Sequence, residues 1–236
     1  MIGILVVVAV AAVVQLAAGF GFALVSVPLL ALVTDAHQAV LLALLLGTVG
    51  NLGQAIEGRS VVDRAVIGRL LLGALVGLPL GWIAFTRSDA RVLQLTIGAV
   101  ILVAVVALAR GATLARGSRR VDLLVGALSG ALTTCTGAAG PPIVAVLHAR
   151  REPPEVFRAT ATTTFLALDV VAIAIYAATG HLTWDQVITT ALALPALAVG
   201  ALVGVRLRRV LSPQTFRVIV LVLLTVTAAT AIITAL

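Results

Sequence analysis

Two glycine-rich interruptions inside long apolar segments carry the residues best suited to chemistry. The apolar segment 121–147 is interrupted by Thr133-Thr134-Cys135-Thr136-Gly137, and Gly140-Pro141-Pro142 follows. Proline is favoured in the first turn of a helix, so Gly140-Pro141 predicts that a new helix begins inside this segment. A helix that begins there directs free N–H groups and its positive dipole end at its surroundings. The pattern therefore predicts an anion site at the interruption.

A second interruption lies in the first apolar segment, 2–33. Gly19-Phe20-Gly21-Phe22 divides it, and Gln15 lies one helical turn before Gly19. The limbs, about 2–18 and 22–33, would be roughly 26 Å and 18 Å long, against a membrane core of about 30 Å. Backbone freed from helical pairing cannot face lipid. We therefore expect each interrupted segment to form a helical hairpin that enters the membrane, breaks and turns back.

Polar side chains on the spans after the interruptions complete the predicted site. Thr48, Asn51 and Gln54 repeat at intervals of three and share one side of a helix, and a run of threonines lies at a matching place in the second half. A threonine in a membrane helix often bonds the carbonyl four residues earlier, so packing is the alternative interpretation for any one of them. The predicted substrate-binding residues are Gln15, Gly19, Gly21, Phe22, Thr48, Asn51, Gln54, Thr134, Gly137, Gly140, Pro141, Thr160, Thr163 and Thr164.

Asp169 is the only carboxylate well inside a predicted span, which makes it a candidate for function. A proton relay and a structural hydrogen bond to another helix fit it equally well. Cys135 is either a soft contact for a sulfur anion or a small packing residue. As the single cysteine it excludes an internal disulfide or a multi-cysteine metal site. No set of His, Asp and Glu has catalytic or metal-binding spacing, so we expect no metal, no cofactor and no enzyme activity.

The composition predicts a membrane-embedded scaffold for these residues. Of the 236 residues 61% are hydrophobic and 11% charged, and the mean hydropathy is +1.22. A soluble domain of this size could not bury that much apolar surface. The net charge of +7 comes from 16 arginines and no lysine. These arginines fall in short loops between apolar spans, so we interpret them as topological anchors and not as a nucleic-acid surface.

An internal duplication is predicted by the order of the segments. After the first hairpin, spans are expected at about 38–55, 66–85 and 92–108, and after the second at about 156–178, 186–205 and 216–236. Gly19 and Gly137 lie 118 residues apart, and Gly77-x-x-x-Gly81 resembles Gly200-x-x-x-Gly204. We expect one all-α membrane domain, 1–236, made of two repeats, about 1–115 and 116–236. Each repeat is a broken, re-entrant helical hairpin followed by three transmembrane helices.

The arginine positions predict how the two repeats are oriented. If each interrupted segment crossed the membrane once, the arginines would divide 9 to 7 between the two faces. If each returns to its own side, one face keeps only Arg87 and Arg91, and the other 14 of the 16 lie opposite. The second division is the one that the positive-inside rule demands. It gives each repeat an odd number of crossings, so the repeats are inverted and both termini lie outside the cytoplasm.

The motifs resemble the TauE/SafE sulfite exporter family over essentially the entire chain. The similar stretches are Gly19-Phe20-Gly21-Phe22 with Pro28-Leu29, Gly137-x-x-Gly140-Pro141, and Arg158-Ala159-Thr160-Ala161-Thr162. The resemblance implies a bacterial inner-membrane permease for small sulfur-containing or organic anions, such as sulfite or an organosulfonate. Members of the family are assigned to both export and uptake, so the direction of transport does not transfer.

The expected function is secondary transport of a small anion by alternating access, with proton coupling through Asp169 as a separate hypothesis. The expected partners are the anion, protons and the lipid bilayer, with no nucleic acid, and the protein is expected to be a monomer or a homodimer. A passive anion channel or facilitator is one alternative. A membrane subunit that scaffolds a partner enzyme without transporting anything is another.

Overall fold

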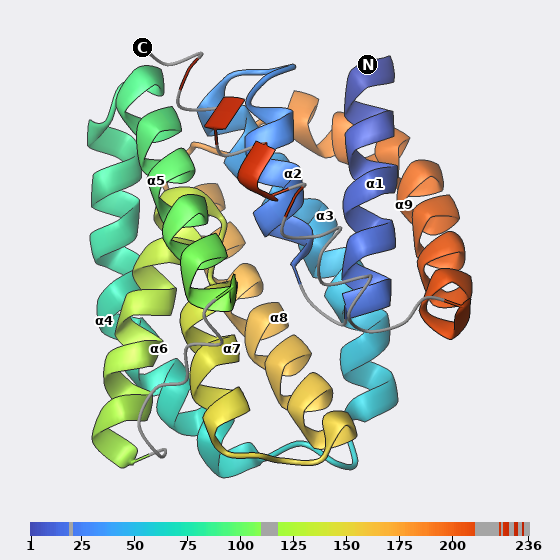
Figure 1. The fold of residues 1–236 in the computed structure, drawn as a ribbon. Helices are drawn as coiled ribbons and strands as arrows, with labels where there is room; N and C mark the ends of the chain where they lie inside the picture. Colours follow the sequence, from blue (N-terminus) through green and yellow to red (C-terminus); the bar gives the residue numbers. More distant parts are fainter. Residues whose placement is uncertain are drawn as a thin grey trace.

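The described part of the chain is all-helical. The computed structural model describes residues 1–18, 21–109, 118–210, 222, 224–226, 229–230 and 233, and no β-strand occurs among them. The helices are α1 Ile2–Ala18, α2 Phe22–Leu30, α3 Ala36–Gly58, α4 Arg64–Arg87, α5 Ala90–Ala109, α6 Arg119–Thr136, α7 Gly140–Ala149, α8 Pro154–Ala178 and α9 Trp184–Val210 (Figure 1). Their bounds follow the predicted spans within a few residues. The predicted last span, 216–236, lies mostly outside the described residues.

Within the described residues, four helices are long and apolar enough to cross a membrane, namely α3, α4, α8 and α9. This confirms the prediction of a helical membrane protein. Large apolar side chains on the outside of α4 and α9, such as Leu75, Val76 and Leu202, are more than half exposed. Such surfaces suit lipid as the solvent, because lipid tails are as apolar as leucine.

Each predicted interruption separates two helices. Gly137 ends α6 in the left-handed conformation, with φ +69°, and its N–H donates to the Thr133 carbonyl. Gly21 precedes α2 with φ +100°. Residues with a side chain rarely adopt these angles, which explains the glycines. The predicted Pro141 lies at the beginning of α7. Gly19 lies outside the described residues.

Each hairpin returns to the edge of the molecule from which it enters (Figure 1). Helix α1 descends from the N-terminus at the upper edge, and α2 returns upward. Helix α6 rises from the lower edge and α7 goes back down, whereas α3, α4 and α8 run between the edges. The connection between α4 and α5, which follows Arg87, lies at the upper edge, whereas the connections that begin at Arg59 after α3 and at Arg150 after α7 lie at the lower edge (Figure 1). Which edge faces the cytoplasm stays a prediction. Arg110, Arg116 and Arg217 lie outside the described residues.

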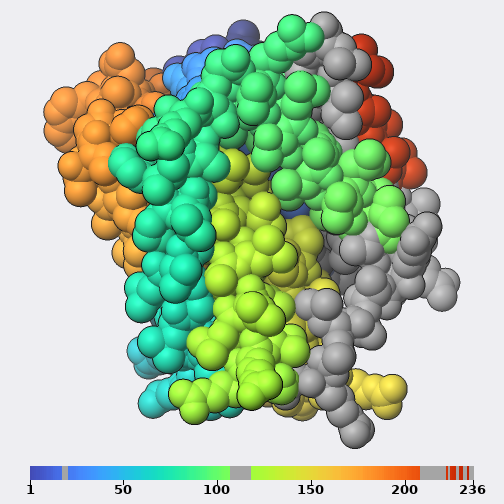
Figure 2. All heavy atoms as spheres, turned by 90° about the vertical axis from the view of Figure 1, so that its left-hand side faces the viewer, coloured from blue at the N-terminus to red at the C-terminus, as the bar shows by residue number. Residues whose placement is uncertain are grey.

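Small residues hold two pairs of helices in close contact. On α4, a Cβ added to Gly77 would lie 1.8 Å from the Ala127 carbonyl oxygen of α6. On α9, a Cβ at Gly200 would lie 2.3 Å from the Ala9 carbonyl oxygen of α1. Backbones approach this closely only where the side chain is missing. Figure 2 shows α4 and α6 side by side along one face. Thus α4 packs on α6, the first helix of the second hairpin, and α9 packs on α1, the first helix of the first hairpin.

Candidate functional site

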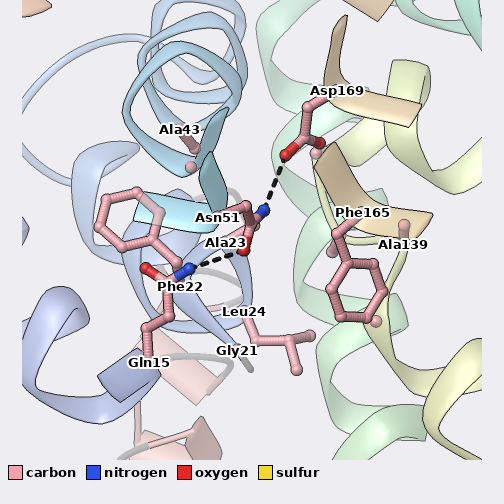
Figure 3. A pocket seen from close by; sticks show the side chains of 14 residues that line it. Gln15, Gly21, Phe22, Ala23, Leu24, Ala43, Asn51, Ala139, Phe165 and Asp169 are labelled. Carbon is pink, nitrogen blue, oxygen red and sulfur yellow. Dashed lines mark hydrogen bonds between the residues drawn. The ribbon is translucent and has the colours of Figure 1, made fainter. Parts of the chain in front are cut away.

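A small cavity lies where the two hairpin breaks meet α3 and α8 (Figure 3). Its volume is about 40 Å³, which gives room for about two or three water molecules. Its lining comes from α1, both breaks, the first turns of α2 and α7, and the middles of α3 and α8. The lining residues are Gln15, Gly21, Phe22, Ala23, Leu24, Ala43, Gly47, Asn51, Gly137, Ala138, Ala139, Gly140, Phe165 and Asp169.

A series of hydrogen bonds joins the three polar side chains of the lining. The Gln15 Nε2 group donates to Asn51 Oδ1 at 2.8 Å, and the Asn51 Nδ2 group donates to Asp169 Oδ2 at 3.1 Å (Figure 3). All three side chains are buried, with exposed fractions of 1%, 6% and 8% respectively. Asp169 forms no ion pair within the described parts of the chain. These hydrogen bonds therefore connect α1, α3 and α8, and they end at a carboxyl group that has no positively charged partner among the described residues.

Eight of the 14 lining residues form pairs that are 118 residues apart. Asn51 and Asp169 form one such pair and bond to each other across the cavity. The same interval joins Gly21 with Ala139, Phe22 with Gly140, and Gly47 with Phe165, all in the lining. Helices α3 and α8 also begin 118 residues apart, at Ala36 and Pro154. Sequence reasoning missed Gly47, Phe165 and Ala139. The interval between Gly19 and Gly137 leads from the predicted Gly21 to Ala139, but Gly47 and Phe165 correspond only to each other.

Several predicted residues are brought together at the cavity. Gln15, Gly21, Phe22, Asn51, Gly137, Gly140 and Asp169 all line it. Free N–H groups in the first turn of a helix point along its axis. The first turns of α2 and α7 both contribute to the lining, so the cavity is close to two positive helix ends. Whether these residues bind an anion stays a prediction.

The predicted threonines and Gln54 lie away from this cavity, and all of them except Thr163 bond to backbone. Thr48 donates to the Leu44 carbonyl at 2.8 Å and Thr164 to the Thr160 carbonyl at 2.7 Å. Thr160 accepts from the Asp63 N–H at 3.0 Å, in the connection between α3 and α4. Gln54 donates to the Gly50 carbonyl at 3.4 Å. The Thr163 hydroxyl is buried with no hydrogen-bond partner among the described residues. Pro141 and Cys135 are half-buried and do not line the cavity.

The last turn of α6 is fixed to two neighbouring helices. The Thr134 hydroxyl donates to the Leu78 carbonyl of α4 at 2.7 Å, and the buried Tyr176 hydroxyl of α8 donates to the Thr134 carbonyl. That carbonyl is one of those left without a helical donor because α6 ends at Thr136. Tyr176 thus satisfies a backbone group that the break exposes.

A wider pocket of about 380 Å³ opens at the upper edge. The Phe85 ring, which lines it, lies edge-on to His37 and to Tyr176, with ring centres 4.7 Å and 4.9 Å apart. His37 Nε2 also lies 3.2 Å from the Phe85 carbonyl oxygen, so that nitrogen is the donor. The pocket is lined by Asp35, His37, Gln38, Leu41, Phe85, His181, Thr183, Asp185 and Gln186.

An ion cluster joins both ends of the second hairpin to α4 at the lower edge. Asp122, in the first turn of α6, is fully buried. Its Oδ2 lies 2.8 Å from Arg69 Nε of α4, and its Oδ1 lies 2.5 Å from a terminal nitrogen of Arg150, which follows α7. The sequence predicted both arginines only as anchors, because the contact joins residues far apart in the chain.

No curated protein and no solved structure matches the chain. The family model described as "Sulfite exporter TauE/SafE" matches residues 4–231, which include both hairpins and the whole cavity. Its members are membrane transporters and not enzymes. This chain therefore belongs to the sulfite exporter TauE/SafE family and is a membrane transporter of the class that exports sulfur anions.

Proposed function

We propose that this protein is a secondary transporter that moves a small anion, such as sulfite or an organosulfonate, across the bacterial inner membrane by alternating access. One observation carries the proposal. The cavity collects the first turns of both broken helices and the only polar chain that links α1, α3 and α8 among the described residues. Broken helices that meet near the membrane midplane are the usual construction of substrate sites in secondary transporters.

The proposed anion site would consist of N–H donors and one exchangeable carboxyl group. The N–H groups at the beginning of α2 and the Gly140 N–H of α7 would bind anion oxygens, whereas Pro141 and Pro142 carry no N–H. The amino groups of Gln15 and Asn51 would add to these donors. Asp169 would take up a proton when the anion binds, because two negative charges in so small a cavity repel strongly. The volume of about 40 Å³ favours a compact anion such as sulfite over a larger organosulfonate in this conformation.

We also propose that the two halves are inverted repeats that move against each other. In the proposed repeats, α1 corresponds to α6, α3 to α8, and α4 to α9. If the halves are exchanged, the contact between α4 and α6 corresponds to the contact between α9 and α1, and both contacts occur. It likewise turns the contact between α3 and α9 into that between α8 and α4, and both of these occur. The contact between α3 and α8 maps onto itself. This exchange supports two equivalent conformations, one open to each edge, which alternating access requires.

The test is ligand-dependent stability followed by flux. Purified protein would be screened by thermal shift against sulfite, sulfate, thiosulfate, sulfoacetate, taurine and lactate, and a ligand at about a hundred times its Kd should add about 2.7 kcal/mol of stability. Asn51→Ala should abolish the shift. Leu52→Ala should keep it, because Leu52 lies next along α3 and faces outward, with 47% of its surface exposed.

Flux into proteoliposomes then separates the alternatives. Alternating access predicts uptake that saturates with anion concentration. Flux that simply follows the anion gradient without saturation would favour a passive channel. If none of the six anions changes the stability or crosses the membrane, the scaffold alternative replaces the transporter.

A further inference from the structure

The direction of the hydrogen bonds between Gln15, Asn51 and Asp169 is set by the carboxylate. A carboxylate only accepts hydrogen bonds, so Asn51 must present its amino group to Asp169 Oδ2, 3.1 Å away. The Asn51 carbonyl oxygen then accepts from the Gln15 amino group at 2.8 Å. The remaining atom, Gln15 Oε1, is buried and has no partner among the described residues. The hydrogen-bonded series therefore ends in an unpaired acceptor on Gln15, a residue that lines the cavity (Figure 3).

A proton on Asp169 would reverse every bond in this chain. A protonated carboxyl group can donate, so it would give its hydrogen to the Asn51 carbonyl oxygen after that amide rotates by half a turn. Once the Gln15 amide also rotates by half a turn, the Asn51 amino group would donate to Gln15 Oε1, which leaves the Gln15 amino group free. The carbonyl and amino ends of an amide have nearly the same shape. The reversal therefore needs no movement of a helix.

We propose that this reversible chain couples anion binding to proton binding: a proton from the aqueous side binds Asp169, and Gln15 in consequence presents a donor to the anion. The inference rests on the proposed function and gives its coupling mechanism. Without the proton, an anion in the cavity would meet the Asp169 charge and the lone pairs of Gln15 Oε1. With the proton, it would meet a neutral carboxyl group and an N–H donor. Proton and anion would therefore bind together and leave together.

No other charged group intervenes in this exchange. Asp169 is the only titratable residue in the cavity lining, and within the described residues only Asn51 forms a hydrogen bond with its carboxyl group. Helices α1 and α2 carry no titratable side chain. Helix α8 itself carries Glu155, Arg158 and Tyr176, and the helices packed against it carry, among others, Glu57, Arg69, Asp122, Cys135 and His148. None of these residues lines the cavity.

Two glycines of α3 allow a matched test. A Cβ at Gly50 would lie 2.5 Å from Gln15 Oε1 and 3.2 Å from Gln15 Cδ. These atoms are at the far end of a flexible side chain, so Gly50→Ala should displace the Gln15 amide and leave the backbone in place. A Cβ at Gly53 would meet nothing within 4 Å. Gly53→Ala, one turn further along the same helix, is therefore the control.

The experiment measures sulfite affinity in mildly acidic and mildly alkaline buffer, with proton uptake on binding determined by calorimetry. Sulfite itself titrates in this range, but its own contribution is the same for every variant and cancels in the comparison. For the wild type and Gly53→Ala, the affinity for sulfite should rise from the alkaline to the acidic buffer. This rise should be about tenfold larger than the titration of sulfite itself would give. Gly50→Ala and Asp169→Asn should lose this excess and the extra proton. Gln15→Met, which removes the amide at similar length, should do the same, and it serves if Gly50→Ala fails to fold.

The outcomes separate the inference from the function on which it rests. If the wild type binds no sulfite or other sulfur anion in either buffer, the proposed function is wrong. If sulfite binds but Gly50→Ala and Gln15→Met keep the full pH dependence while Asp169→Asn loses it, Asp169 senses the proton without the amide chain. That result overturns the inference and leaves the transporter in place.

Discussion

The glycine contacts between helices predict an order of destabilisation for three Gly→Ala variants. A carbon–oxygen contact normally lies at about 3.3 Å. The Cβ of alanine at position 77 would lie 1.8 Å from a carbonyl oxygen of α6, so α4 and α6 would have to separate by about 1.5 Å. The same reasoning for Gly200 and Gly204, with distances of 2.3 Å and 2.7 Å to carbonyl oxygens of α1, gives separations of about 1.0 Å and 0.6 Å.

The expected order of destabilisation is therefore Gly77→Ala, then Gly200→Ala, then Gly204→Ala. The neighbouring atoms are backbone and cannot turn aside, so Gly77→Ala should cost about 3 kcal/mol and Gly204→Ala about 1 kcal/mol. Gly68→Ala on α4 is the control, because its Cβ would meet nothing within 4 Å. That variant should be neutral or gain up to about 1 kcal/mol from helix propensity.

The assay is thermal unfolding in one detergent or nanodisc, with each variant compared with the wild type. The refuting result is a Gly77→Ala variant that unfolds at the same temperature as Gly68→Ala. The helices would then not be in backbone contact, and the close packing of both pairs would lose its support. A reversed order of Gly77→Ala and Gly204→Ala would refute the reasoning from distance alone.

Three further predictions follow from single side chains. Asp122→Asn should lower the free energy of unfolding by about 2 kcal/mol or more, measured by thermal unfolding, because Arg69 and Arg150 both lose the buried carboxylate that they share. An unchanged stability would show that the cluster is not formed. Tyr176→Phe should cost about 1–2 kcal/mol in the same assay, since it leaves the Thr134 carbonyl without its donor. Cys135→Ser should leave sulfite affinity unchanged, because Cys135 does not line the cavity; a loss of binding would restore the alternative of a soft contact with a sulfur anion.

The positions of the breaks could be predicted because they depend on local chemistry. Glycines that must adopt positive φ, and a proline that begins a helix, act within a few residues of themselves. Gly21, Gly137 and Pro141 therefore lie where the sequence predicted. The helix bounds followed for the same reason, since each span is a long apolar run with a polar connection at either end.

Which polar side chains reach the cavity could not be predicted from spacing by three. A step of three residues falls about 60° short of a full turn, so Thr48 and Gln54 lie on either side of Asn51, about 120° apart. The cavity instead follows a step of four along α3, through Ala43, Gly47 and Asn51. A polar stripe and a cavity stripe that cross in this way share only one residue.

Long-range partners decided the other differences. Thr134 was predicted to bind substrate, but the bare backbone of α4 at Gly81 brings the Leu78 carbonyl within reach of its hydroxyl. The ion pairs of Asp122 join three elements whose order in space no local pattern reveals. Both depend on which helices touch, and that information lies in the packing of the whole chain.

The ion cluster at the second hairpin also bears on which state the transporter occupies at rest. If the proposed inverted halves were identical, the conformation open to one edge would have the same structure as the conformation open to the other edge, rotated by half a turn. Both conformations would then be equally populated. The positions that correspond to Asp122, Arg150 and Arg69 in the opposite half are Ile4, Leu32 and Leu192, all apolar. A conformation that keeps the cluster and one that breaks it therefore differ in energy, and about 1.4 kcal/mol is enough for a tenfold excess of one. In this way a few charged residues would determine to which side a nearly symmetric scaffold is open in the absence of substrate.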